Sequence, residues 1–130
     1  MKKFLLSISI AIITLLLTQA VYAEQNNTID VYDLWKAVQE DRTAAINLYK
    51  GQEIKVEGIV LYTGVSVYLT PNVALSNVEQ GTEYVKCVLP RLDMDKLNDF
   101  QFGQKVKMTG VFYRVSDYGI IIMKQCRITN

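Results

Sequence analysis

The chain has 130 residues, with 14 basic and 13 acidic side chains and a net charge of +1 at neutral pH. This length suits a single domain. A charge so close to zero argues against a protein that attracts polyanions through a strong overall field. The sequence contains no histidine, which removes the commonest general base and a common metal ligand. Composition therefore excludes histidine-dependent catalysis and leaves a small, near-neutral binding domain as the first expectation.

Residues 1–23 have the layout of a secretory signal peptide. Lys2 and Lys3 supply a positive start, an uncharged apolar run covers residues 4–18, and small residues end at Ala23. The run is shorter than the roughly 20 residues of a membrane-spanning helix, and an uncleaved anchor is the alternative. No cysteine follows the run, so a lipid-anchored protein is not expected. Cleavage would leave a chain of about −1 net charge in the bacterial periplasm or outside the cell, without further membrane association.

Residues 24–29 are polar and predict a flexible lead-in, so the single folded domain is expected over residues 30–130. Asp30 is a good N-cap for a helix whose apolar stripe includes Trp35. Asp41 or Thr43 caps a second helical stretch that ends at Gly51. Core packing is the expected role of Trp35, with ligand stacking as the alternative.

After Gly51 the period of the apolar residues changes from helical to alternating. This pattern predicts strands over residues 52–63, 65–70, 83–89, 104–115 and 120–128, a turn-rich loop over 71–82, and a helix over 91–100. The inward set of the last strand changes parity near Lys124, which suggests a bulge. This order predicts a mainly β (α+β), five-stranded OB-fold-like barrel with an N-terminal helical extension, in which the later helix plugs one end. A small sandwich or an open sheet is the rival.

Two stretches echo each other, "GQEIKVEGIV" at residues 51–60 and "GQKVKMTGVF" at 103–112. They fall on the first and fourth predicted strands, which pair in an OB barrel. Each contains a mid-strand glycine, Gly58 or Gly110, where the absence of a Cβ permits a sharp bend or a close approach. The echo is therefore interpreted as one geometric rule obeyed twice, and a duplicated binding site is not expected.

Cys87 and Cys126 form an even pair in a chain expected to be exported, which suggests a disulfide. Two buried free thiols are the alternative. A zinc site is not expected, because two cysteines supply only half of a tetrahedral ligand set. A catalytic thiol is not expected either, since no CxxC partner or histidine accompanies them.

The segments "DLW", "YKGQEIKVEGIV", "VKCVL", "FGQKVKMTGVF" and "IIIMKQCRI", in this order, resemble the exported bacterial OB-fold proteins of the tRNA_anti-like family. The resemblance covers most of residues 30–128 and implies the fold. The family name records a likeness to anticodon-binding domains, which transfers no function by itself. The paired cysteines of the family match Cys87 and Cys126, whereas the lipoprotein cysteine at the mature start is absent.

No nucleophile elbow, P-loop or zinc signature points to an enzyme, and no cofactor or metal is expected. OB-folds bind ligands on their second and third strands. The candidates for this surface are Tyr62, Tyr68 and Tyr84 as stacking residues, with Lys86 and Arg91 as phosphate ligands. Packing at the barrel edges is the alternative role of these tyrosines. The expected function is a non-enzymatic binding module for a protein, peptide, glycan or small ligand. The alternative is a protein that binds single-stranded nucleic acid or another polyanion.

Overall fold

A computed structural model describes residues 27–129. The predicted signal peptide and residues 24–26 of the lead-in lie outside these residues. None of the described helices is long and apolar enough to cross a membrane. The elements in chain order are β1 (Thr28–Asp30), α2 (Val31–Glu40), α3 (Arg42–Tyr49), β2 (Glu53–Val65), β3 (Pro71–Ser76), β4 (Val85–Val88), the 3₁₀ helix η1 (Arg91–Asp99), β5 (Lys105–Val115) and β6 (Ile121–Ile128).

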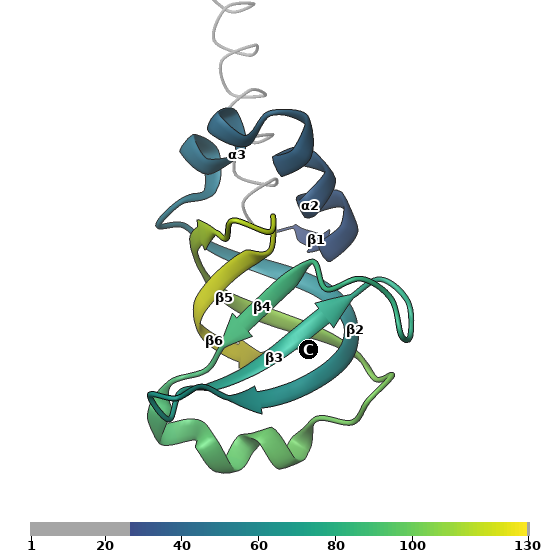
Figure 1. Ribbon diagram of the computed structural model, residues 1–130, viewed down its shortest axis with the longest axis vertical. Helices are drawn as coiled ribbons and strands as arrows, with labels where there is room; N and C mark the ends of the chain where they lie inside the picture. The colour runs from purple at the N-terminus through teal and green to yellow at the C-terminus, as the bar shows by residue number, and fades with distance from the viewer. Residues whose placement is uncertain (1–26, 130) are drawn as a thin grey trace, which may run out of the picture.

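Five strands close into the expected OB-fold-like barrel. Their order is β2-β3-β4-β6-β5, and β2 also pairs with β5, which removes the free edges. All of these pairs are antiparallel except β4 with β6, which run parallel. Helices α2 and α3 cover one end of the barrel and η1 covers the other (Figure 1). The helix that was predicted to plug one end of the barrel is therefore confirmed as η1.

The second predicted strand was misplaced. Residues 65–70 were expected to form it, but Ser66–Thr70 make a tight turn, and the strand is β3, in the predicted turn-rich loop. The Ser66 hydroxyl accepts hydrogen bonds from the backbone N–H groups of Tyr68 and Thr70, and Leu69 has a left-handed φ of 58°. Side-chain bonds of this kind compete with strand pairing. The apolar alternation of residues 65–69 therefore lies on an exposed turn, with Val67 91% exposed.

The N-terminal segment also differs from the expectation. Thr28 and Ile29, predicted to be flexible, belong to β1, which pairs in parallel with residues 55–57 of β2. The Asp30 carboxylate accepts from the Tyr32 N–H at 2.9 Å, and Asp41 accepts from the Ala44 N–H at 3.1 Å. Both predicted caps are thus present, and the extension consists of two helices rather than one.

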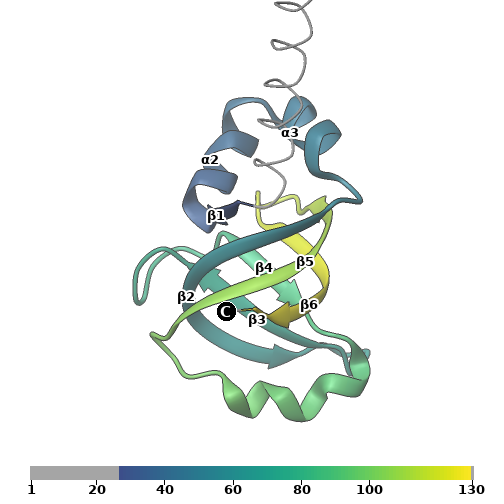
Figure 2. The same ribbon diagram turned by 180° about the vertical axis from the view of Figure 1, so that it is seen from behind.

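The two echoing stretches form one antiparallel ladder between β2 and β5 (Figure 2). Gly58 faces Val106 and Gly110 faces Ile54, so each glycine opposes the same position of the other stretch. The ends match too, since Gly51 N donates to Phe112 O at 2.8 Å and Gly103 N donates to Val60 O at 2.9 Å. An antiparallel pair of two similar segments gives this symmetry, because the start of each lies beside the end of the other. The echo is therefore a rule of strand pairing.

Close approach explains both mid-strand glycines. A Cβ on Gly58 would lie 3.0 Å from the Ser76 carbonyl oxygen, and one on Gly110 would lie 2.7 Å from Cys126 Sγ and 2.9 Å from the Lys124 carbonyl oxygen. The register between β5 and β6 shifts beside Gly110, and Gln125 has a φ of 52°. The predicted bulge near Lys124 is confirmed at this point.

Replacement of Gly110 by alanine is expected to destabilise the protein by about 1–3 kcal/mol, because the new methyl group overpacks against backbone. Gly64→Ala is the matched control in β2, since its Cβ would meet Asn72 only at 3.4 Å and beyond. Chemical denaturation of both variants and the wild type measures the difference. An equal stability of the two variants would contradict the close-approach explanation.

Candidate functional site

Three of the five predicted site residues lie on one outward surface of the sheet. Tyr62 of β2 and Lys86 of β4 are both paired with Ala74 of the intervening strand β3. Tyr84 lies just before β4 and points to the same side as Lys86, because alternate residues share a face. Tyr68 and Arg91 lie elsewhere, at the opposite end of β3 and β4. There, Arg91 Nη2 donates to the Tyr68 carbonyl oxygen at 3.0 Å, which leaves the Tyr68 ring exposed.

Tyr62 reaches across β3 to an acidic group. Its hydroxyl donates to Glu83 Oε2 at 2.6 Å, and Glu83 Oε1 lies 3.9 Å from Lys86 Nζ. Ala74, beneath this contact, has no exposed surface although its position points outward. Burial, followed by the hydrogen bond and the negative charge of Glu83, raises the pKa of Tyr62 to about 12. The phenol therefore stays neutral and acts as a donor at physiological pH.

Tyr84 contributes to an aromatic cluster with two residues of helix α2, Tyr32 and Trp35. The ring centroid of Tyr84 lies 5.6 Å from that of Tyr32 and 5.0 Å from that of Trp35. All three rings retain exposed surface, while Trp35 and Tyr84 also pack against the core. Trp35 therefore packs against the core, as predicted, and also belongs to this aromatic cluster. Sequence reasoning missed Tyr32, although its place three residues before Trp35 puts both on one flank of a helix.

The basic side chains near this surface come mainly from strands that sequence reasoning did not include. Strands β5 and β6 contain no acidic residue and carry Lys105, Lys107, Arg114, Lys124 and Arg127. Register places Lys86, Ile122 and Arg114 side by side on β4, β6 and β5. The Lys124 ammonium lies 3.4 Å from the centre of the Tyr113 ring, a cation–π contact. We call Lys86, Arg114 and Lys124 the basic row.

Two other basic residues of this hairpin form ion pairs with acidic residues on β2. Lys105 Nζ lies 3.1 Å from Glu57, and Arg127 Nη2 lies 3.0 Å from Glu53. Among residues 27–129, no carboxylate lies within 4 Å of the cationic groups of Arg114 or Lys124. On this hairpin, Arg114 and Lys124 therefore offer positive charge to a ligand, as does Lys107, whose register partner on β2 is Glu57. Glu83 partly offsets Lys86.

Cys87 and Cys126 are both fully buried, and their thiols lie within hydrogen-bonding distance although register pairs Cys87 with Met123. When both cysteines are thiols, the hydrogen bond between them and the burial of Cys87 raise the pKa of Cys87 well above its usual range. A thiol in this state is protonated at neutral pH and is a poor nucleophile. The predicted disulfide is compatible with this placement and stays a prediction.

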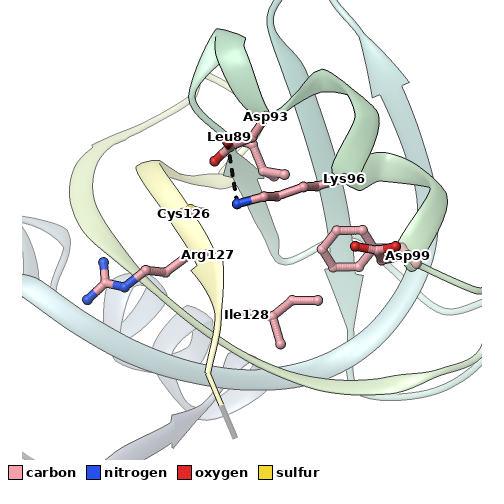
Figure 3. A pocket seen from close by; sticks show the side chains of 8 residues that line it. Leu89, Asp93, Lys96, Asp99, Cys126, Arg127 and Ile128 are labelled. Atoms are coloured by element: carbon pink, nitrogen blue, oxygen red, sulfur yellow. Dashed lines mark ion pairs between the residues drawn. The ribbon is translucent and has the colours of Figure 1, made fainter.

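A pocket of about 160 Å³ lies between η1 and the end of β6 (Figure 3). Its floor includes Leu89, Phe100 and Cys126, and its rim carries charged side chains. Lys96 pairs with Asp93 at 3.5 Å, and Arg127 extends towards Glu53. The charges around this pocket are thus largely satisfied. No cluster of three or more potential metal-binding side chains occurs in the part of the chain that the structure describes.

Comparisons with known proteins agree with this architecture. The family model tRNA_anti-like matches residues 2–127. A "putative nucleic acid-binding lipoprotein" from Klebsiella pneumoniae superposes with a TM-score of 0.69 at 15% identity, covering 85% of this chain and 97% of its own. A putative aspartyl-tRNA synthetase from Leishmania major superposes with a TM-score of 0.52 at 11% identity, over 78% of this chain and 20% of its own. At such identities the likeness shows the fold alone. No curated protein matches the chain.

Replacement of Glu83 by glutamine is expected to lower the pKa of Tyr62 towards its ordinary value of 10.0, because the charge and the strongest acceptor are lost. In the wild type, the pKa of Tyr62 is about 12 in the folded protein and 10.0 in the unfolded chain. The contribution of this phenol to the free energy of unfolding is therefore constant below the lower value and falls as the pH rises between the two. Tyr62→Phe should remove that part of the alkaline decline. Ultraviolet titration of the phenolates, together with denaturation at several alkaline pH values, measures both effects. An unchanged alkaline decline in Tyr62→Phe would contradict them.

The predicted disulfide can be tested directly. It would close a loop of roughly 40 residues and stabilise the fold by about 4 kcal/mol on the chain-entropy estimate. Mass spectrometry after alkylation, with and without reductant, is expected to find no reactive thiol in the unreduced, denatured protein. Two alkylated cysteines in that sample would show that the pair consists of buried free thiols.

Proposed function

The chain belongs to the tRNA_anti-like family, and on this basis we propose that it is an exported, non-enzymatic OB-fold binding protein whose ligand is a single-stranded polyanion. The proposed surface consists of the basic row and the aromatic cluster. Nucleic acid is the polyanion that uses both, since phosphates need cations and bases stack on aromatic rings.

The observation that carries the proposal is the basic row. Lys86 and Arg114 lie on strands that both neighbour β6, and Ile122 lies between them. Neighbouring strands are about 4.8 Å apart, so the backbones that carry these two residues are separated by about 10 Å across the sheet. Spacing of this order allows one backbone to contact several cations at once. The aromatic cluster borders Lys86, because Tyr84 is its nearest outward neighbour along the chain.

Two further observations support the exported binding role. Residues 1–23 have the features of a signal peptide, and the Klebsiella protein of the same fold is described as a "putative nucleic acid-binding lipoprotein". The described residues also offer little for catalysis, since both cysteines are buried, burial and a hydrogen bond raise the pKa of the Cys87 thiol, and Asp93 is paired with Lys96. A binding role needs neither group to be reactive.

From the sequence, a polyanion is the alternative ligand, because Lys86 and Arg91 on the expected binding surface are accompanied there by Glu57, Glu79 and Glu83. Arg114 and Lys124 change this balance. If the following experiment finds no binding of a polyanion, it would favour a peptide, glycan or small ligand bound at the aromatic cluster.

Fluorescence anisotropy with a labelled single-stranded oligonucleotide tests the proposal. The wild type should bind at low salt, and its affinity should fall steeply as salt rises. Arg114→Gln should weaken binding about fivefold, by loss of roughly 1 kcal/mol of hydrogen bonding, and lower the salt slope by about 1.

Arg127→Gln is the matched control, because it also removes one positive charge from the hairpin but at a residue paired with Glu53. It should bind nearly as tightly as the wild type. Equal losses in the two variants would point to a general charge effect, and no binding by the wild type at low salt would reject the polyanion.

A further inference from the structure

A second pocket lies where the helical extension meets the barrel. Its volume is about 320 Å³, and its lining residues come from α2, the start of α3 and the turn between β5 and β6: Val38, Gln39, Arg42, Asp117, Tyr118 and Gly119. This is near the lower end of the volumes that hold small molecules in proteins. None of these residues was a candidate on sequence grounds.

The walls of this pocket are held in place by hydrogen bonds. Within the turn, Ser116 N donates to Ile120 O at 2.8 Å, and Gly119 N donates to Ser116 O at 3.0 Å. Gly119 has a φ of 82°, and a Cβ there would lie 3.1 Å from Gln39 Nε2. The turn thus fits closely against α2, and the pocket exists before any ligand binds.

Arg42 is the cation of this pocket, and it is already oriented. Its Nη2 donates to the carbonyl oxygens of Val115 at 3.1 Å and Ser116 at 3.3 Å. The guanidinium has five N–H donors, so those on Nε and Nη1 are left for a ligand. Asp117 lines the same pocket, yet no acidic group among residues 27–129 lies within 4 Å of the guanidinium.

Tyr118 and the position of the pocket narrow the class of ligand. The Tyr118 side chain is 92% exposed, so its ring has a free face for stacking. Arg114 of the basic row directly precedes Val115, which Arg42 holds. The turn after Val115 lies at the end of the barrel that α2 and α3 cover (Figure 1). The pocket therefore lies at the border of the basic row and beneath the helical extension, a position suited to the end of a bound polymer.

From this arrangement we infer that the pocket binds the phosphorylated end of a single-stranded nucleic acid. The terminal phosphate contacts Arg42, and the terminal base stacks on Tyr118. Gln39 offers an amide to the polar edge of the base, and Asp117 weakens phosphate binding by charge repulsion. This inference rests on the proposed function and adds a preference for polymer ends.

The test compares oligonucleotides of one sequence that carry a 5′-phosphate, a 3′-phosphate or hydroxyl groups at both ends. One phosphorylated form should bind the wild type about tenfold more tightly than the hydroxyl form, as expected for charge-assisted hydrogen bonds. Arg42→Gln should reduce this preference while changing the affinity for the hydroxyl form by less than about twofold. Tyr118→Ala removes base stacking and should weaken the phosphorylated form, which the pocket holds, more than the hydroxyl form. Asp117→Asn should increase the preference about twofold or more, because a repulsive charge is removed.

Two controls keep the outcomes distinct. Lys36→Gln removes a charge from the exposed part of α2, outside the lining of the pocket, and should leave the preference intact. Arg42 also holds the turn through its hydrogen bonds, so the melting temperatures of the variants are compared. Tyr118→Ala tests the pocket without removing these hydrogen bonds. Equal affinity of the wild type for all three oligonucleotides would overturn the inference and leave the proposed function standing.

If no oligonucleotide binds, the proposed function fails, and the pocket is tested alone with a mononucleoside monophosphate by nuclear magnetic resonance. Shifts of the Gly119 and Gln39 amide signals that disappear in Arg42→Gln would support a phosphate site independent of any polymer. Unshifted signals at millimolar concentrations would overturn the inference as well.

Discussion

The antiparallel contact between β2 and β5 is the constraint on which the rest of this molecule depends. It closes the barrel, and it contains Gly58 and Gly110. Each glycine is approached closely by the strand on its other side, Gly58 by Ser76 of β3 and Gly110 by Lys124 of β6, so neither can carry a side chain without displacing a neighbour. Gly51 and Gly103 start the two segments with left-handed φ angles of 79° and 83°, which glycine adopts at little cost. One short pattern, used twice, therefore sets the turn, the register and the close approach on each side of the seam.

Barrel closure also decides where charge collects. The net charge of +1 hides an uneven distribution, since β5 and β6 carry only basic charged residues while η1 is rich in aspartate. Exposed charges separated by more than about 10 Å are largely screened at physiological salt. A ligand on β4, β6 and β5 therefore responds mainly to Lys86, Arg114 and Lys124. A protein with almost no net charge can in this way still favour an anionic partner locally.

The barrel could be predicted from sequence because alternation of apolar residues in β2 and β5 is long, and because the two echoing segments mark a strand pair. The position of β3 could not, since Val65, Val67 and Leu69 alternate as well as Val73 and Leu75 do. The two segments differ in the Ser66 hydroxyl, which accepts hydrogen bonds from backbone amides and makes Ser66–Thr70 a turn.

The candidate site was harder to predict for a similar reason. Tyr62, Tyr84 and Lys86 were placed correctly from the strand pattern, but Arg114 joins them only through register across β6, and that register is shifted twice by irregularities. Tyr32 and Arg42 reach the surface through the docking of α2 and α3, which no local pattern specifies. Residues that depend on tertiary contacts were therefore those that sequence reasoning missed.

The parallel pairing of β4 with β6 has a consequence for how the chain acquires its structure. During synthesis β4 emerges with only β3 as a partner, and its other edge stays open until Ile121–Ile128 has been made. The hydrogen bond from Arg42 likewise cannot form until Val115, 73 residues further along the chain, has been synthesised. Contacts between distant segments slow folding, because loop closure precedes the stabilising contact. Until β6 has been synthesised, the chain is an incomplete sheet with exposed edges, and the barrel can close only after that strand is available.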